Sequence, residues 1–250
     1  MPVPQLMTNS PFRDRDPIDT ADALVVLTEG DIEVLGRMPY SSNATFLADV
    51  EHPRALVQGI YKPGQGERPL WDFPDGLYQR EVAAFALSDH LGWDLVPPTV
   101  ERDGPLGHGS LQLFIPAVFD LHYFDLVEDE NHHPTLQRLC VFDYVTNNTD
   151  RKGGHCLIDG QGRIWAIDNG LSFHTEFKLR TVIWEFGGEP VPAAVLDDLQ
   201  RLLDEPLPEQ VTRPLSALEC DAVLARTRSI LNAGTFPIDP TGHRYPWPMI

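Results

Sequence analysis

The stretch NTDRKGGHCLIDGQGRIWAIDNGLSF, residues 148–173, decides the fold of this chain. It carries two aspartates, Asp150 and Asp168, on the two sides of a predicted β-hairpin. The arms of this hairpin are residues 156–158 and 164–167, joined by a turn with two glycines. The hairpin places two carboxylates from separate loops near one point. Because neighbouring anions repel unless they share a cation, the arrangement indicates a divalent metal.

The composition limits both the class of protein and its partners. With 250 residues, of which 42% are hydrophobic, the chain can bury a sizeable core, as one large domain or two small lobes. It has 19 basic and 37 acidic residues, which give a net charge of -18. This charge repels nucleic acids and anionic membrane surfaces, so neither is an expected partner.

The cysteines and the N-terminus indicate the cell compartment. The three cysteines are odd in number and form no CxxC pair, which argues against a disulfide framework or a structural zinc site. The first residues lack the apolar run of a signal peptide, and no segment reaches the ~18 apolar residues that span a bilayer. We therefore expect a cytoplasmic protein with reduced thiols and no integral membrane association.

The first part of the chain predicts a small α+β lobe at residues 20–115, after a flexible lead-in at residues 1–19. Short apolar runs between turn residues predict strands, and apolar residues at helical spacing predict helices. The predicted strands are residues 32–36, 44–50, 55–61, 95–100 and 109–115, and the predicted helices are residues 20–28 and 77–91.

Residues 116–250 predict a second, mainly helical lobe, so that residues 20–250 form one bilobal α+β domain. An acidic loop at residues 121–133 precedes predicted helices at residues 134–145, 191–203 and 216–231. Asp143, on the first of these helices, either braces the loop that follows or lies on a solvated helix face. The last residues, 236–250, have too much proline for a helix, and we expect them to pack onto the lobe surface.

The order of these parts is that of a protein-kinase-like phosphotransferase. In this arrangement Lys62 would neutralise nucleotide phosphates, and Glu81 would hold its ammonium group by ion pairing. Asp150 would orient or deprotonate the acceptor hydroxyl, and Lys152 would contact the transferring phosphoryl group. Asp168 would ligate the metal that bridges the phosphates.

Five further residues are predicted to bind the nucleotide. Hydroxyls and N–H groups in the turn between the first two strands would cover phosphate oxygens, and residues after the fifth strand would form the hinge against the adenine. The turn residues are Ser41, Ser42 and Asn43, and the hinge residues are Phe114 and Ile115, followed by Pro116. The alternatives are a plain hairpin turn at residues 41–43 and ordinary solvated side chains for Lys62 and Glu81.

The two aspartate blocks also resemble those of a known family. They read Asn148-Thr149-Asp150-Arg151 and Ala166-Ile167-Asp168-Asn169-Gly170-Leu171-Ser172-Phe173, and Tyr61-Lys62-Pro63 and residues 109–115 are similar as well. Over residues 31–173 the chain resembles the phosphatidylinositol 3/4-kinase-like superfamily, most closely the type II phosphatidylinositol 4-kinases and their compact bacterial relatives. The resemblance implies a bilobal protein-kinase-like fold, ATP with a divalent metal (Mg or Mn), and transfer of the γ-phosphate of ATP to a hydroxyl acceptor.

One position departs from the pattern of that family. The family places an asparagine, its second metal ligand, five residues after the catalytic aspartate, and this chain has His155 there. A neutral imidazole is a softer ligand than an amide oxygen, which favours Mn over Mg. We therefore predict that Asp168 and His155 ligate the metal. Two alternatives stay open: His155 is only a packed residue, or one metal site has been lost and transfer is slow.

The acceptor is the least determined part of the prediction. The chain has no basic amphipathic helix and no polybasic run, so a protein side chain or a soluble polyol fits better than a membrane phosphoinositide. Two other functions remain open for the same fold. One is a nucleotidyl transferase, and the other is a catalytically weak nucleotide-binding regulatory module.

Overall fold

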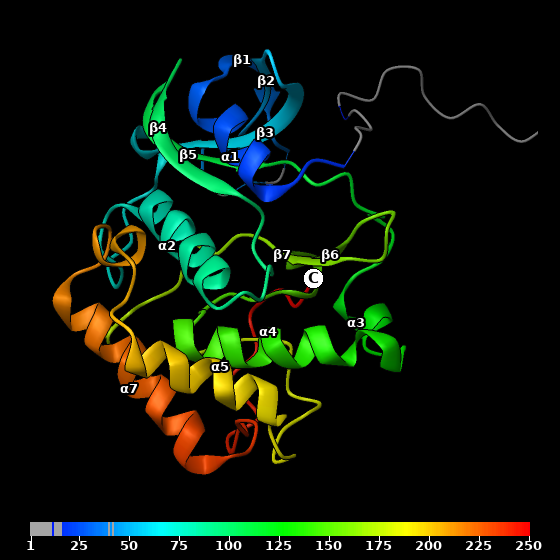
Figure 1. The fold of residues 1–250 in the computed structure, drawn as a ribbon, viewed down its shortest axis with the longest axis vertical. Coiled ribbons are helices and arrows are strands. Elements are labelled where there is room, and N and C mark those ends of the chain that lie inside the picture. The colour runs from blue at the N-terminus through cyan, green and yellow to red at the C-terminus, as the bar shows by residue number, and fades with distance from the viewer. Residues whose placement is uncertain (1–11, 13–16, 40, 42) are drawn as a thin grey trace, which may run out of the picture.

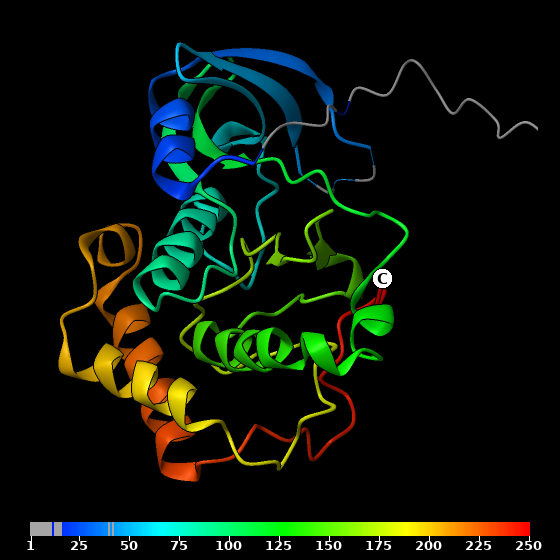
Figure 2. The same ribbon diagram turned by 45° about the vertical axis from the view of Figure 1, so that its right-hand side comes forward.

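The computed structural model describes residues 12, 17–39, 41 and 43–250. Most of the predicted lead-in at residues 1–19 lies outside the described residues, as does Ser42. The chain forms an antiparallel sheet above a mainly helical part, which confirms the α+β fold (Figures 1 and 2).

The upper part is built on a five-stranded antiparallel sheet with the order β1-β2-β3-β5-β4. The strands are β1 (Asp31–Arg37), β2 (Phe46–His52), β3 (Ala55–Pro63), β4 (Thr99–Gly104) and β5 (Gly107–Leu113). Helix α1 (Thr20–Glu29) packs on one face of this sheet, where its Ala23, Val26 and Leu27 are fully buried. The sheet and α1 therefore share one hydrophobic core.

Strand pairing decides which side chains leave this core. Tyr61 in β3 lies opposite Leu111 in β5, and both side chains belong to the core that α1 covers. Lys62, the next residue, lies opposite Ser110. Because side chains alternate along a strand, Lys62 points to the other face of the sheet, toward helix α2.

Helix α2 (Leu77–His90) joins the sheet to the helical part and is buried along most of its length. The other helices are α3 (Tyr123–Leu126), α4 (His133–Thr146), α5 (Ala193–Asp204), α6 (Glu209–Thr212) and α7 (Ala217–Ala233), and three short 3-10 turns are η1 (Gly64–Gly66), η2 (Glu130–His132) and η3 (Gly153–His155). Apolar side chains of α2 and of these helices form a second core. Helix α2 therefore packs into the core of the helical part and also lies against the sheet.

The predicted hairpin is confirmed. Strands β6 (Cys156–Ile158) and β7 (Ile164–Ala166) pair antiparallel, with Leu157 opposite Trp165. Leu157 and Trp165 pack against the upper core, and Ile158 and Ile164 belong to the lower one. The hairpin therefore lies between the two cores, and Asp168 lies two residues after its end.

Two predicted segments differ from the structure. The fourth strand is Thr99–Gly104, whereas residues 95–100 were predicted, because Pro97 and Pro98 have no N–H group to donate to a neighbouring strand. The predicted loop at residues 121–133 contains α3 and η2. The N-terminus of α3 is held by reciprocal hydrogen bonds between His122 and Asp125. This capping pattern is local, but the prediction of a loop was based on the acidic composition of the segment.

The last residues pack onto the helical part, as predicted. The Arg244 carbonyl accepts a hydrogen bond from the Thr181 N–H group at 3.1 Å, and the Met249 carbonyl accepts one from Gly153 at 2.7 Å. The C-terminus consequently lies beside the β6–β7 hairpin (Figures 1 and 2). Among the described residues, no helix is long and apolar enough to cross a membrane.

Candidate active site

Three predicted residues meet at one point between the sheet and the hairpin. The ammonium group of Lys62, from β3, donates to Oε1 of Glu81, from α2. The same ammonium group donates to Oδ1 of Asp168 at 2.8 Å. Lys62 thus joins the sheet, α2 and the segment after β7 through two ion pairs.

The charges of this group reinforce one another. Burial opposes the charge of Lys62, but the carboxylates of Asp168 and Glu81 together raise its pKa. The ammonium group of Lys62 in turn holds the pKa of Asp168 well below its usual range. Lys62 is therefore a permanent cation, and Asp168 a permanent anion, at neutral pH.

The backbone around Asp168 aims its side chain at Lys62. Asp168 has φ 58°, in the left-handed region that Asp tolerates better than most residues. The next N–H group, of Asn169, donates to Oε2 of Glu81 at 2.9 Å. Glu81 is 2% exposed, and both of its oxygens are bonded in this way. One buried carboxylate therefore fixes both the lysine and the backbone beside the aspartate.

Asp150 and Lys152 form a separate ion pair on the loop after α4. Nζ of Lys152 lies 2.9 Å from Oδ2 of Asp150, and both side chains are partly exposed. The N–H group of Asp150 donates to the Asn148 side-chain oxygen at 2.9 Å, which shapes the turn. A substrate can reach this pair. The predicted base, Asp150, and the predicted cation, Lys152, therefore lie side by side.

A buried arginine that sequence reasoning missed holds this loop to the hairpin. Arg151 is fully buried, and its Nε donates to both carboxylate oxygens of Asp143 at 3.1 Å. Its other nitrogens donate to the Ile167 carbonyl at 2.7 Å and to the Asn169 side-chain oxygen at 2.6 Å. Asp143 therefore braces the loop, one of the two alternatives left by the sequence. The sequence feature that could have indicated a role for Arg151 is its position between Asp150 and Lys152, two predicted site residues.

His155 lies beside Asp168, and its ring is neutral. Its Nε2 is 3.5 Å from Oδ2 of Asp168 and its Nδ1 is 3.5 Å from the Lys152 backbone nitrogen. Burial lowers the pKa of His155 below its ordinary value, so the neutral ring, with one lone-pair nitrogen, predominates at neutral pH.

The donor set suits a cation that arrives with a nucleotide. Within the described residues, no group of three or more His, Cys, Asp or Glu side chains could hold a metal by itself. Asp168 and His155 offer two ligands. Mg²⁺ in nucleotide sites is held by one or two protein ligands, with phosphates and water completing the coordination. The two ligands therefore fit a cation bound together with ATP phosphates.

The turn after β1 contacts the Gly-rich insert that begins at η1. The Asn43 side-chain oxygen accepts a hydrogen bond from the Arg68 N–H group at 3.1 Å, and Ala44 donates to the Gly66 carbonyl at 3.1 Å. A Cβ atom on Gly66 would lie 2.4 Å from that of Ala44, so the two segments touch closely. Among the described contacts, none joins Ser41 or Asn43 to Lys62 or Asp168.

The predicted hinge residues are buried where the sheet meets the helical part. Ile115 packs into the upper core with Trp165. The Phe114 N–H group donates to the Gln58 carbonyl at 2.9 Å. The ring of Phe12 stacks on that of Phe114, with centroids 5.1 Å apart and planes 9° from parallel. Sequence reasoning missed Phe12, because it had placed this residue in the flexible lead-in.

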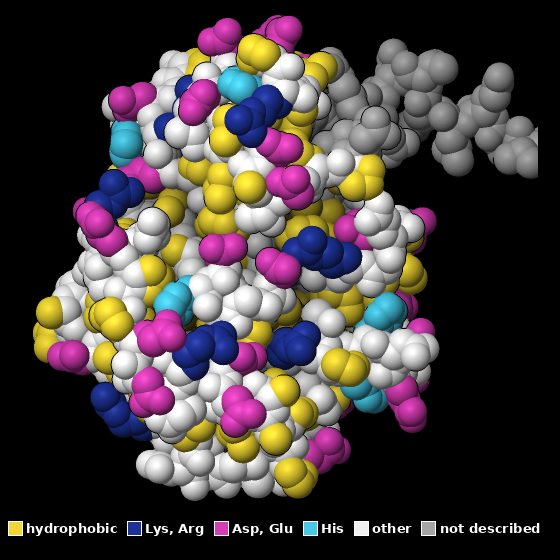
Figure 3. Space-filling view, viewed as in Figure 1, with side chains coloured by type: hydrophobic (Ala, Val, Ile, Leu, Met, Phe, Trp, Pro, Cys, Tyr) yellow, Lys and Arg dark blue, Asp and Glu magenta, His cyan; other side chains and the backbone are white. Residues whose placement is uncertain are grey.

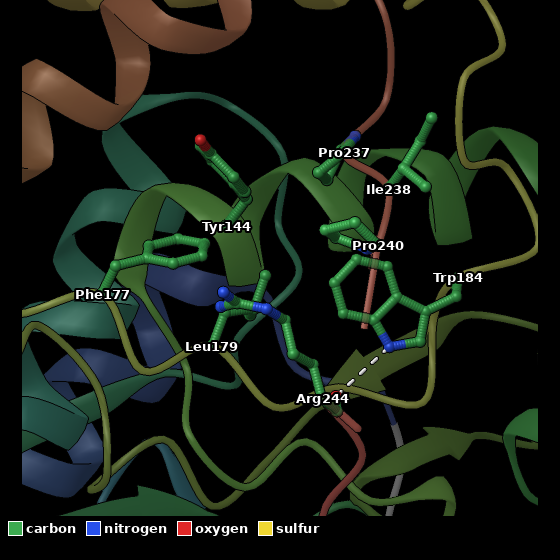
Figure 4. Close-up of a pocket in the computed structure, with 8 residues that line it drawn as sticks. All are labelled: Tyr144, Phe177, Leu179, Trp184, Pro237, Ile238, Pro240 and Arg244. Atoms are coloured by element: carbon green, nitrogen blue, oxygen red, sulfur yellow. Dashed lines mark hydrogen bonds between the residues drawn. The ribbon is translucent and has the colours of Figure 1, made fainter. Parts of the chain in front are cut away.

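A pocket of about 210 Å³ lies elsewhere, between α4 and the C-terminal segment (Figure 4). Its lining includes Tyr144, Phe177, Trp184 and Arg244, and Arg244 extends across the ring of Phe177 with its guanidinium carbon 4.8 Å from the centroid. None of the predicted site residues lines this pocket. It is therefore separate from the site at Lys62 and Asp168.

The structure is similar to that of hydra Fam20 with sugar, with a TM-score of 0.56 and 14% identity, covering 86% of this chain and 87% of that one. The Helicobacter pylori proinflammatory kinase CtkA is similar with a TM-score of 0.45 and 12% identity, over 84% of this chain and 94% of that one. The fold is thus the predicted bilobal protein-kinase-like fold.

The sequence is 39% identical to Protein Rv2133c of Mycobacterium tuberculosis in an alignment 265 positions long, which covers 91% of this chain and 95% of that protein. The chain belongs to the same family as Protein Rv2133c. No protein-family model matches the chain.

Proposed function

We propose that this protein is an ATP-dependent phosphotransferase that moves the γ-phosphate of ATP to a hydroxyl acceptor. The observation that carries the proposal is the position of Lys62, whose ammonium group is bonded to both Glu81 and Asp168. A lysine held by a helical glutamate and a metal-binding aspartate beside it are the parts that bind nucleotide phosphates in kinases. Ser41, Ser42, Asn43, Phe114 and Ile115 stay assigned to the nucleotide as part of this proposal.

In the proposed reaction the acceptor oxygen forms a bond to the γ-phosphorus, and the bond from that phosphorus to the β,γ-bridging oxygen breaks. ADP is the leaving group. Asp150 accepts the proton of the acceptor hydroxyl. Lys152, whose Nζ lies 2.9 Å from Asp150, stabilises the negative charge of the phosphoryl group during transfer.

Asp168 and His155 would hold the divalent cation, Mg or Mn. When bound, this cation neutralises phosphate charge and orients the γ-phosphate. Lys62 neutralises further phosphate charge from the side of the sheet, and Glu81 keeps its ammonium group in place. The neutral ring of His155 gives the site a softer ligand than an amide oxygen.

The proposed acceptor is a protein side chain or a soluble polyol. On the face seen in Figure 3, basic side chains are scattered among acidic ones and do not gather into one patch. The net charge of -18 further disfavours an anionic lipid or nucleic acid as acceptor. The relationship to the phosphatidylinositol 3/4-kinase-like superfamily, and to type II phosphatidylinositol 4-kinases in particular, belongs to this proposal on the strength of the two aspartate blocks.

The location and domain division are proposed on similar grounds. All three cysteines, Cys140, Cys156 and Cys220, are free thiols, which supports a reducing compartment such as the cytoplasm. We assign residues 20–115 and 116–250 to the two lobes of one domain, because the sheet with α1 has its own core, although α2 of the first lobe packs into the core of the helices.

Incubation of the pure protein with labelled ATP and Mg or Mn, followed by mass spectrometry of protein and solution products, tests the function. We expect phosphate transfer that Asp150→Ala abolishes while nucleotide binding stays within about twofold, since Asp150 acts on the acceptor. Asp221→Ala, on the exposed surface of α7, serves as the matched control and should retain transfer. An added nucleotide in place of phosphate would identify a nucleotidyl transferase. Binding without any product would identify a regulatory module.

A further inference from the structure

Arg80, the residue before Glu81 on α2, is a buried charge that the proposed chemistry does not use. It is 4% exposed, and its guanidinium group forms an ion pair with Glu219, at the start of α7. The same group donates to the Ser172 carbonyl at 2.7 Å and lies over the ring of Phe73, 5.0 Å from its centroid. Removing such a charge from water is costly, and the cost is offset only if the guanidinium group is well placed for its ion pair and hydrogen bonds.

Arg80 and Glu81 hold the same short segment at its two ends. Glu81 accepts the N–H of Asn169 at 2.9 Å, and Arg80 donates to the carbonyl of Ser172 at 2.7 Å. Asp168 precedes this segment directly. Helix α2 is therefore bonded to the backbone that follows the metal-binding aspartate at two points, three residues apart.

Glu219 is itself held rigidly at the start of α7. Its Oε2 accepts hydrogen bonds from the N–H and the hydroxyl of Ser216, both at 2.8 Å, in a capping box. Its Oε1 accepts from Arg80. The N-terminus of α7 thus holds the Glu219 carboxylate in place. This carboxylate binds the Arg80 guanidinium group, and Arg80 in this way links α7 to α2.

We infer that Arg80 is a positioning residue: anchored by Glu219, it holds α2 against residues 169–172 so that Glu81 stays bonded to Lys62 and Asn169. Kinase activity as such rests on the proposed function, whereas the anchoring itself concerns the fold. The anchor thereby stabilises the position of α2 in which the Lys62–Glu81 pair is formed.

The test compares Arg80→Met with a matched control, Arg226→Met. Arg226 is another buried arginine, 7% exposed, that donates to the Val145 carbonyl at 2.7 Å and to the His174 carbonyl at 3.2 Å. Its substitution removes a buried charge from the same helical part without touching α2. Both variants are measured at a temperature where each is folded, and Arg226→Met shows how much a general loss of stability speeds exchange.

The first readout is hydrogen exchange of the Asn169 amide, followed by NMR, because this amide is bonded to Glu81. Arg80→Met should speed its exchange on the order of tenfold, whereas Arg226→Met should leave it unchanged. The second readout is ADP release from ATP, where kcat should fall about 100-fold in Arg80→Met, since a misplacement of about 1 Å has that effect. If Arg80→Met does not fold, Glu219→Gln, which keeps the shape and removes the charge, should shift both readouts in the same direction.

Unchanged Asn169 exchange in Arg80→Met or Glu219→Gln, or an equal increase in Arg226→Met, would overturn the anchoring role. The exchange measurement needs no nucleotide, so it decides this role even if the wild-type protein transfers no phosphate. Conversely, wild-type transfer together with unchanged exchange would reject the anchor and leave the proposed function standing.

Discussion

His155 stands five residues after Asp150, where the resembled kinases have an asparagine. Its Nε2 is 3.5 Å from Asp168, so a ring nitrogen and a carboxylate face the same space. We expect phosphate transfer to be faster with Mn than with Mg, and His155→Asn to shift the preference toward Mg. Transfer rates at saturating concentrations of each metal measure this preference. A variant with an unaltered Mn to Mg ratio would show that His155 is only a packed residue.

The same histidine predicts a pH dependence of stability. Burial lowers the pKa of His155 from 6.5, so the folded state binds its proton more weakly than the unfolded chain does. Its contribution is complete above pH 6.5 and is lost as pH falls through the lower folded value. Wild-type protein should therefore lose more free energy of unfolding between about pH 7.5 and about pH 5.5 than His155→Asn, by at most ~1.4 kcal/mol per pH unit. Urea titrations at the two pH values test this, and parallel losses would contradict it.

At the scale of elements, helix α4 supports the loop that carries Asp150. Asp143, on its last turn, holds Arg151, and Arg151 holds the backbone before Asp168. The Thr181 hydroxyl donates to Asp143 at 3.1 Å from the other side. The two predicted carboxylates are thus carried by loops that share one fully buried ion pair.

Breaking this pair should cost more than removing its neutral neighbour. Asp143→Ala leaves Arg151 buried without its anion, and we expect a loss of about 3–5 kcal/mol in the free energy of unfolding. Thr181→Val removes the hydrogen bond to Asp143 and the one that the Thr181 hydroxyl accepts from the Ile183 N–H group, but it removes no charge, and it should cost about 1.5–3 kcal/mol. Urea unfolding of both variants measures the two losses. A loss for Asp143→Ala no larger than that for Thr181→Val would contradict the bracing role.

At the scale of the whole molecule, a bound nucleotide would connect the sheet to the hairpin through Lys62 and Asp168. A ligand at 100 times its dissociation constant stabilises the folded state by about 2.7 kcal/mol, which is about 5–10 °C in Tm for a chain of this size. We expect that shift with ATP and Mg or Mn, and expect Lys62→Met to remove it. Lys178→Met serves as the control, because Lys178 pairs with Asp72 and Glu176 away from the site. An equal shift in wild type and Lys62→Met would place the nucleotide elsewhere.

The sequence alone determined the parts whose signals are local. The hairpin at residues 156–166, helix α2 and the third strand, which ends beside Lys62, all follow from patterns within a few residues. Because apolar residues recur with a different period in strands and in helices, these patterns also indicated which segments are strands and which are helices, and thus the α+β fold. The strand predicted at residues 95–100 begins only at Thr99, after Pro97 and Pro98. These prolines are also a local signal, but the prediction gave more weight to the apolar residues around them.

Only the tertiary structure decided which charged side chains share a site. Nothing near Arg80 in the sequence indicates Glu219, and nothing near Phe12 indicates Phe114. Lys62 and Asp168 were chosen from the order of parts, but their 2.8 Å contact depends on how the sheet packs on the hairpin. The physical reason is that buried ion pairs join segments far apart in the chain, where their geometry depends on packing and no local propensity records it.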